Sequence, residues 1–163
     1  DGQPDIYEFD KTTKNSVKLT DFSGIDVSGQ YLSNEKEIVF VSNRLGYPNI
    51  FKKYTDSPTV SQMVFKGREN NSCDTKGNKI VYSSRESKNI FGSNTFNIYL
   101  ISNGATFPIT SSGENQFPRF SDDGNIVMYI RQSKGNSYAG FVNYKTGQNK
   151  LFEINSRVQS IDW

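Results

Sequence analysis

The chain contains no histidine and only one cysteine among its 163 residues. The absence of histidine removes the commonest general base and the commonest transition-metal ligand, which weighs against catalysis. No metal and no other cofactor is predicted. The single cysteine, Cys73, excludes an intrachain disulfide and leaves the redox compartment open. These absences favour a binding protein over an enzyme.

Long apolar runs and an excess of one charge sign are also missing. The longest apolar runs, such as residues 38–41, are far shorter than the ~20 residues that span a bilayer, so no transmembrane segment is predicted. The 19 basic and 17 acidic residues give a net charge of +2, which predicts neither a nucleic-acid surface nor an anionic-lipid surface. The chain begins with Asp1 and has no basic-then-apolar leader, which predicts that it is processed or cut from a longer protein.

Aromatic residues make up 13% of the chain although only 34% of it is apolar. Each buried aromatic side chain removes roughly 150–250 Å² from water, so a few rings can hold an interior together. The length suits one compact domain. We therefore predict a single domain with an aromatic and β-branched core.

A sequence module recurs along the chain. Three similar segments end in arginine: IVFVSNR at Arg44, IVYSSR at Arg85 and IVMYIR at Arg131. The intervals between these arginines are 41 and 46 residues. A second element recurs at intervals of 44, 48 and 43 residues, at Ile6, Ile50, Ile98 and Phe141. These periods are close to the ~40–45 residues of one four-stranded propeller blade.

Turn chemistry places the strands within the third module. Residues 115–121 read as a strand, and the Asp-Asp-Gly-Asn of 122–125 reads as a tight turn, because Asp offers a local acceptor and Gly tolerates positive φ. Strands are predicted next at 126–131, 138–144 and 150–154. The result is a four-stranded antiparallel meander. No window shows helical periodicity, and about 15 strands are expected in all.

We therefore predict an all-β fold, a β-propeller of four-stranded antiparallel blades with about three complete blades plus partial blade strands. Residues 21–65, 66–110 and 111–155 are the predicted blades. Residues 1–20 are predicted as the outer strands of another blade, and 156–163 as the inner strand of the closing blade. An open propeller exposes the backbone hydrogen-bonding groups of its edge strands. We therefore expect residues 158–163 to pair with residues 1–20 of the same chain or to join another chain. If the edges stay open, the chain is expected to self-associate through them.

The repeats IVFVSNRLGYPNIF and NQFPRFSDDGNIVMYIR resemble the TolB-type propeller repeat. That repeat has a Pro-x-(Phe/Trp)-Ser strand, an Asp-Gly turn, an apolar strand ending in Ser-(Asp/Asn)-Arg, and then Ile-Tyr. The segment VQSIDW at 158–163 is similar to the C-terminus of this family in ε-proteobacteria. The resemblance implies part of a six-bladed propeller in a non-catalytic, periplasmic subunit of the Tol–Pal envelope system. It implies the Pal lipoprotein, other Tol proteins and colicins as partners.

Seven residues are candidates for partner contact: Arg44, Tyr47, Arg85, Phe91, Glu114, Gln116 and Arg131. The three arginines are predicted at equivalent strand ends on one face. There they either meet a partner's acidic groups or bond loop carbonyls and the next blade, and their periodic recurrence favours the structural role. Tyr47 and Phe91 lie on loops, where an aromatic ring is either an interface anchor or local packing.

Two further features have structural explanations. Residues 122–125 are predicted to be a plain turn and not a calcium site. Cys73, aligned with Leu32 and Phe120 on an inner strand, is predicted to be a buried apolar residue and not a nucleophile. The propeller portion of a prolyl-oligopeptidase-like hydrolase stays open as an alternative function. A glycosidase lacks a convincing pair of carboxylates.

Overall fold

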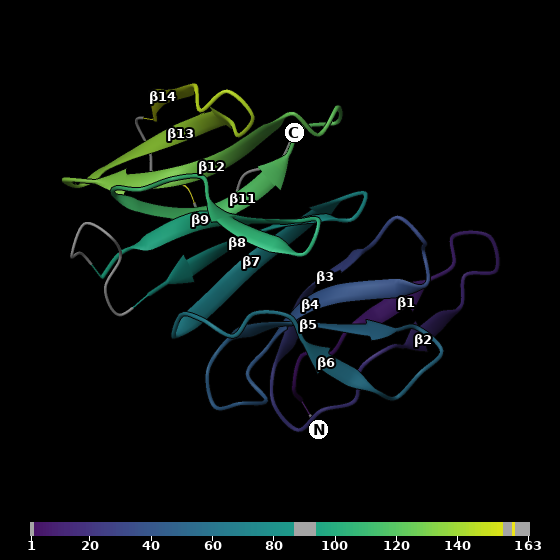
Figure 1. Ribbon diagram of the computed structural model, residues 1–163. Coiled ribbons are helices and arrows are strands. Elements are labelled where there is room, and N and C mark those ends of the chain that lie inside the picture. Colours follow the sequence, from purple (N-terminus) through teal and green to yellow (C-terminus); the bar gives the residue numbers. More distant parts are fainter. Residues whose placement is uncertain (1, 87–93, 155–157, 159–163) are drawn as a thin grey trace.

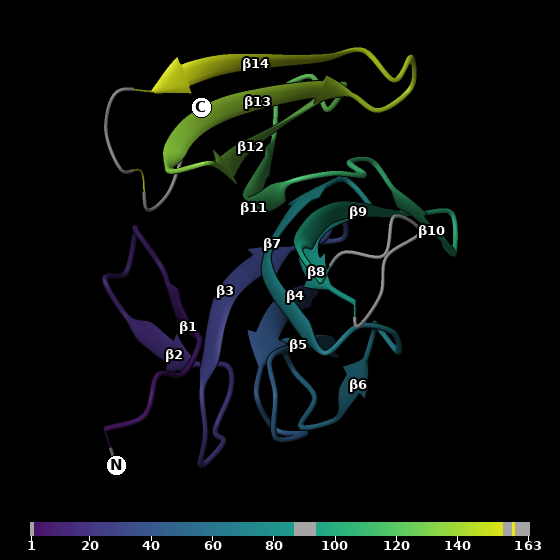
Figure 2. The same ribbon diagram turned by 90° about the vertical axis from the view of Figure 1, so that its left-hand side faces the viewer.

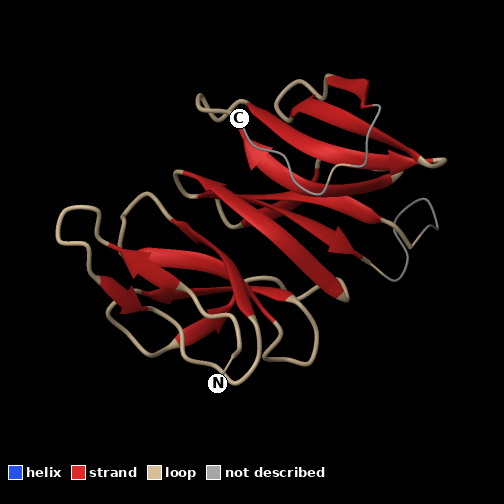
Figure 3. Cartoon of the chain, turned by 180° about the vertical axis from the view of Figure 1, so that it is seen from behind, coloured by secondary structure: helices blue, strands red, loops and turns tan. Residues whose placement is uncertain are grey.

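The fold consists of strands and loops alone over the residues that the computed structural model describes, 2–86, 94–154 and 158 (Figure 3). The strands are β1 (Tyr7–Phe9), β2 (Ser16–Lys18), β3 (Asp26–Tyr31), β4 (Glu37–Ser42), β5 (Asn49–Tyr54), β6 (Val60–Gln62), β7 (Glu69–Lys76), β8 (Lys79–Arg85), β9 (Phe96–Ser102), β10 (Ala105–Pro108), β11 (Glu114–Phe120), β12 (Ile126–Ser133), β13 (Asn136–Asn143) and β14 (Asn149–Ile154). Within these described ranges, no helix is long and apolar enough to cross a membrane.

The strands form three four-stranded sheets and one two-stranded sheet (Figure 1). The sheets are β3–β6, β7–β10 and β11–β14, each an antiparallel meander, preceded by the pair β1–β2. The prediction of an all-β fold with four-stranded antiparallel sheets is therefore confirmed. The predicted inner strand at 156–163 lies, apart from Val158, outside the described residues, so its pairing stays a prediction.

Successive sheets pack face to face around their first strands. Strand β7 contacts both β3 and β11, and Figure 2 shows it between them. Val41 of β4 and Tyr82 of β8 belong to one buried cluster, and Ile98 of β9 and Tyr129 of β12 belong to the next. A third cluster joins the segment around β1 and β2 to β4 and β5. Each sheet hides its apolar face against its neighbour, as repeat architectures require.

The tight turns form as their residues predict. Gly77 and Gly124 have positive φ angles of 63° and 66°, which glycine adopts without a Cβ penalty. In the turn at 121–125 the Asp123 carboxylate accepts a hydrogen bond from the Asn125 backbone N–H at 3.0 Å. Hydrogen bonds from the Ser121 hydroxyl and from Asn125 lower the pKa of Asp123 to about 2. The carboxylate is thus engaged in closing the turn.

Each first strand contains a β-bulge at the same place. The register shifts between residues 27 and 30 in β3, between 71 and 74 in β7, and between 116 and 119 in β11. A residue with positive φ lies in each bulge: Ser28, Ser72 and Phe117. Because a bulge adds one unpaired residue, side-chain alternation changes phase there. The recurrence makes the bulge a property of the repeating unit.

The bulge changes which residues are equivalent to Cys73. Counted from the positive-φ residue, its equivalents are Gly29 and Pro118, so the predicted alignment with Leu32 and Phe120 is wrong. The error arises because the extra bulge residue cannot be seen in apolar alternation. Cys73 itself is 0% exposed, as predicted for a buried apolar side chain.

We expect Cys73 not to react with Ellman's reagent in the folded protein. Burial, the largest cause, raises the pKa of the Cys73 thiol to about 12, and its Sγ donates a hydrogen bond to the Ser28 carbonyl at 3.3 Å. Since the thiolate is the nucleophile, no absorbance change should occur at about pH 8 until the chain unfolds. In guanidinium chloride the single thiol should titrate fully. Rapid labelling of the native chain would contradict the buried position.

Candidate functional site

The described candidate residues gather at one edge of the sheets, which we call the loop edge. At this edge β3 begins, β4 ends and β5 begins, because Asp26 pairs with Ser42 and Ser42 pairs with Asn49. Strands β11, β12 and β13 meet in the same way. The connections between sheets also lie here. We call the opposite edge, with the tight turns at 32–36 and 121–125, the turn edge.

Arg44 is held in a buried ion pair. Its Nη2 lies 3.0 Å from Asp26 Oδ2, and its Nε donates to Ser42 Oγ at 2.9 Å. Three aromatic rings lie 5.0–5.4 Å from its guanidinium carbon: Phe22, Phe40 and Phe51. The Asp26 side chain is 0% exposed, so the positive charge compensates a carboxylate removed from water. This geometry supports the structural alternative for Arg44.

Arg85, Glu114 and Gln116 come together across two sheets, and we call them the interblade cluster. Arg85 Nη2 lies 3.1 Å from Glu114 Oε1, and Gln116 Nε2 donates to the same oxygen at 3.4 Å. The Arg85 guanidinium lies 4.4 Å from the centre of the Phe96 ring, and its Nε lies 3.9 Å from Glu69 Oε2. The Arg85 and Glu114 side chains are 35% and 27% exposed. Solvent, and therefore a partner, reaches this cluster.

Arg131 lies over the connection that precedes β11. Its Nη2 donates to Ser112 Oγ at 3.0 Å. Gly113 has a φ of 83°, and a Cβ added there would come within 2.5 Å of Arg131 Nε. Glycine therefore lets the guanidinium lie directly on the backbone of this loop.

Tyr47 is presented on the short connection between β4 and β5. Its side chain is 42% exposed, and that of the neighbouring Leu45 is 47% exposed. Gly46 between them has a φ of 88°, which turns the chain sharply. The Pro48 carbonyl accepts a hydrogen bond from the Asn70 backbone N–H at 2.9 Å, which ties the connection to β7. The loop is therefore anchored while its two apolar side chains face solvent.

The prediction that the three arginines occupy equivalent strand ends is wrong. In the pairing of each second strand with the first strand of its sheet, Arg131 occupies the position of Ser42 and Ser84. Arg85 lies one residue, and Arg44 two residues, C-terminal to that position. The cause is again the pairing register between strands, which is set by the position of the bulge. It is not set by the end of the strand. Phe91 lies outside the described residues.

Sequence reasoning missed a set of buried polar residues at the loop edge. Asp26, Asn70 and Asn115 occupy equivalent register positions, are 0% exposed, and follow one another at intervals of 44 and 45 residues. Asn70 Nδ2 donates to Asn49 Oδ1 at 3.1 Å, and Asn115 Nδ2 donates to Asn97 Oδ1 at 3.3 Å. These amides tie each first strand to the preceding sheet. Their even spacing was the signal that could have revealed them.

A polar cavity of about 350 Å³ lies between the first strands. Gln30, Asp74 and Arg119 line it at equivalent positions just beyond each bulge. Asp74 Oδ2 accepts a hydrogen bond from the Phe120 backbone N–H at 2.8 Å, which joins β7 to β11. Among the described residues, no group of three or more His, Cys, Asp or Glu side chains could hold a metal ion.

The shifted pKa values of two tyrosines have structural causes. Burial, and then the charge and hydrogen bond of Glu86, raises the pKa of Tyr99 to about 12. Burial is also the largest cause that raises the pKa of Tyr82, whose ring stacks on that of Tyr99 with centroids 5.7 Å apart. Both phenols stay protonated near neutral pH. Their rings pack against each other.

Comparison with known proteins places this geometry in a family. The model of the TolB beta propeller domain matches residues 1–163. The Tol-Pal system protein TolB of Wolinella succinogenes is 46% identical over 99% of this chain, and that of Helicobacter hepaticus is 44% identical over 98%. The chain spans 39% of the length of each. The crystal structure of TolB from Acinetobacter baumannii superposes with a TM-score of 0.78 and 24% identity, over 93% of this chain and 38% of that one. The chain therefore belongs to the TolB β-propeller family.

Proposed function

We propose that this chain is part of a non-catalytic, protein-binding propeller of the Tol–Pal system in the periplasm, and that its loop edge binds the Pal lipoprotein. Its family and the names of its relatives support membership of that system. The absence of histidine supports a role in binding over one in catalysis. Through Pal and other Tol proteins the propeller would support outer-membrane integrity, cell division and protein import.

The interblade cluster is the observation that carries this proposal. It joins an arginine from one sheet to a glutamate and a glutamine from the next, and solvent reaches it. Such a cluster offers both donors and acceptors to a partner. Tyr47 and Leu45, exposed on an anchored loop of the preceding sheet, add apolar area at the same edge. Aromatic and arginine side chains are the usual energetic centres of protein interfaces.

Two finer roles belong to the same proposal. Colicins would occupy the loop edge as well, in competition with Pal. Self-association of this chain through open strand edges is supported by exposed apolar side chains on β1, β2 and β14, which are Tyr7, Phe9, Val17, Leu151 and Phe152. The alternative of a hydrolase propeller is disfavoured because the matching relatives are named Tol-Pal system proteins.

We expect Tyr47→Ala and Gln116→Ala to weaken Pal binding by the full-length protein about tenfold each. The first variant removes exposed aromatic area, and the second removes an amide from the interblade cluster. Isothermal titration of the purified protein with soluble Pal measures the effect.

Tyr54→Ala provides the matched control. Tyr54 is 50% exposed, but it pairs with Glu37 and therefore lies at the turn edge. Its affinity for Pal should stay within about twofold of wild type. The proposal fails if wild-type protein does not bind Pal, or if Tyr54→Ala weakens binding as much as Tyr47→Ala does.

A further inference from the structure

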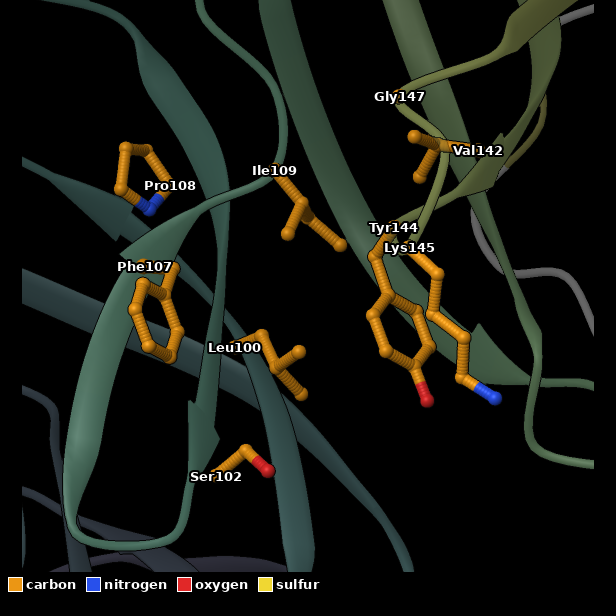
Figure 4. A pocket seen from close by; sticks show the side chains of 9 residues that line it. All are labelled: Leu100, Ser102, Phe107, Pro108, Ile109, Val142, Tyr144, Lys145 and Gly147. Carbon is orange, nitrogen blue, oxygen red and sulfur yellow. The ribbon is translucent and has the colours of Figure 1, made fainter.

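A groove of about 450 Å³ opens at the turn edge between the sheets β7–β10 and β11–β14. Figure 4 shows Leu100, Phe107 and Ile109 on one side of it, and Val142 and Tyr144 on the other. Leu100 and Val142 are buried and form the floor, while Phe107 is half exposed at the rim. Both flanking sheets are complete, so the groove does not arise from an unfinished blade.

The preceding blade carries polar residues at two of the equivalent positions. By register, Leu100 corresponds to Lys52, and Lys79 corresponds to Glu37. In that blade Lys52 Nζ lies 3.0 Å from Glu37 Oε1, so an ion pair lies on that surface. Phe107 likewise corresponds to Ser61. Ile109 and Val142 correspond to the apolar Met63 and Ile101, so this part of the lining recurs in the repeat. The apolar Leu100 and Phe107 are specific to this pair of sheets.

The wall formed by Tyr144 is fixed in position. Its hydroxyl donates to the Gly124 carbonyl at 2.7 Å. Its ring meets that of Phe120 edge-on, with centroids 6.4 Å apart. A groove whose walls are held in this way needs little reorganisation to accept a side chain, which lowers the entropic cost of binding.

Two lysines give the rim a positive charge. Lys79 Nζ lies 5.7 Å from the centre of the Tyr144 ring, and Lys145 Nζ donates to Asn125 Oδ1 at 2.7 Å. Asp123 accepts hydrogen bonds from Ser121 and Asn125, and the charge of Lys145 is the last of the causes that lower its pKa. An incoming carboxylate would therefore meet ammonium groups beside an apolar floor.

We propose that this groove is a second docking site, which takes an extended acidic segment of a partner protein with one bulky apolar side chain. The apolar side chain enters between Leu100 and Val142, and flanking carboxylates meet Lys79 and Lys145. The site lies at the edge opposite the interblade cluster, so it is independent of the proposed Pal contact.

A blocked pentapeptide with a central phenylalanine and two aspartates on each side is a suitable probe. Fluorescence anisotropy of the labelled peptide with the full-length protein should show saturable binding. Replacing the phenylalanine by serine, or the aspartates by lysines, should abolish it. Raising the salt concentration should weaken it, because exposed charges are screened.

Variants of the rim test the location. Phe107→Ser introduces the residue of the preceding blade, and Lys145→Glu reverses one charge; each should weaken binding about tenfold. Phe65→Ser and Lys134→Glu are the matched controls, since Phe65 is 79% exposed, Lys134 is exposed as well, and both lie in loop-edge connections. The controls should bind within about twofold of wild type.

Three results would overturn this inference. They are the absence of saturable binding up to about 1 mM peptide, unchanged affinity in Lys145→Glu, and an equal loss in Phe65→Ser. Sedimentation provides a further check: if Phe107→Ser alters self-association of the protein, the groove binds a second copy and not an acidic partner. Pal titrations of Phe107→Ser and Lys145→Glu should be unchanged, because both residues lie at the turn edge, so failure here is distinguishable from failure of the proposed function.

Discussion

Replacing Gly140 by alanine is expected to lower the free energy of unfolding by about 3 kcal/mol, at the upper end of overpacking effects. Gly140 of β13 pairs with Tyr129 of β12, and a Cβ at Gly140 would lie 2.2 Å from Cζ of that ring. The ring cannot move aside easily, because Tyr129 is 0% exposed and its hydroxyl donates to Asn149 Oδ1 at 2.9 Å. Urea unfolding followed by circular dichroism measures the change.

Gly29→Ala is the control for this substitution. Gly29 also lies in a strand, but the atom that its Cβ would approach is the Cγ2 methyl group of Ile6, at 2.9 Å, and the site is exposed. We expect a change below about 1 kcal/mol, because Gly29 is exposed and its neighbour is one methyl group of a half-buried side chain and not a buried ring. Equal effects of the two substitutions would show that the Tyr129 contact is not what makes glycine necessary at position 140.

Replacing Arg44 by methionine is expected to destabilise the protein by about 3–5 kcal/mol, the usual cost of leaving a buried charge without its partner. The substitution removes the cation that compensates Asp26, whose side chain is 0% exposed. It also removes the contacts with three surrounding phenylalanine rings. Comparison of urea midpoints at constant pH measures the loss.

A second substitution separates charge from packing. The equivalents of Asp26 in the next two sheets are Asn70 and Asn115, so Asp26→Asn is compatible with the repeat. In the Arg44→Met background, Asp26→Asn should restore stability, because no buried charge is then left unpaired. Arg68→Met, at an exposed arginine, should change stability by less than about 0.5 kcal/mol. A neutral Arg44→Met would contradict the structural role of the ion pair.

Sequence periodicity predicted the secondary structure well because turns and apolar alternation are local signals. The segments around Ile38 and Ile126 are strands β4 and β12, and the Asp-Gly turn closes at Gly124. The register could not be predicted, because one bulge residue shifts every later position and leaves the alternation on each side intact. The misplaced equivalents of Cys73 follow directly from this.

The sequence predicted Arg85, Glu114 and Gln116 as partner contacts but not their contact with one another, because the contact between sheets depends on how the blades pack. The partner of Arg44 was missed for the same reason, since Asp26 is 18 residues away and its burial depends on tertiary packing. Local sequence specifies the strands, whereas long-range packing decides which side chains meet.

Within the described chain, each sheet is hydrogen-bonded from consecutive strands and packs on the sheets that come before and after it in the sequence. Every ladder in the described chain joins strands that follow one another directly, so a blade can complete its hydrogen bonding as soon as its own stretch of polypeptide is free. A polypeptide delivered gradually from its N-terminus would therefore assemble in the order of its delivery. Each finished blade would offer the next one a surface on which to condense.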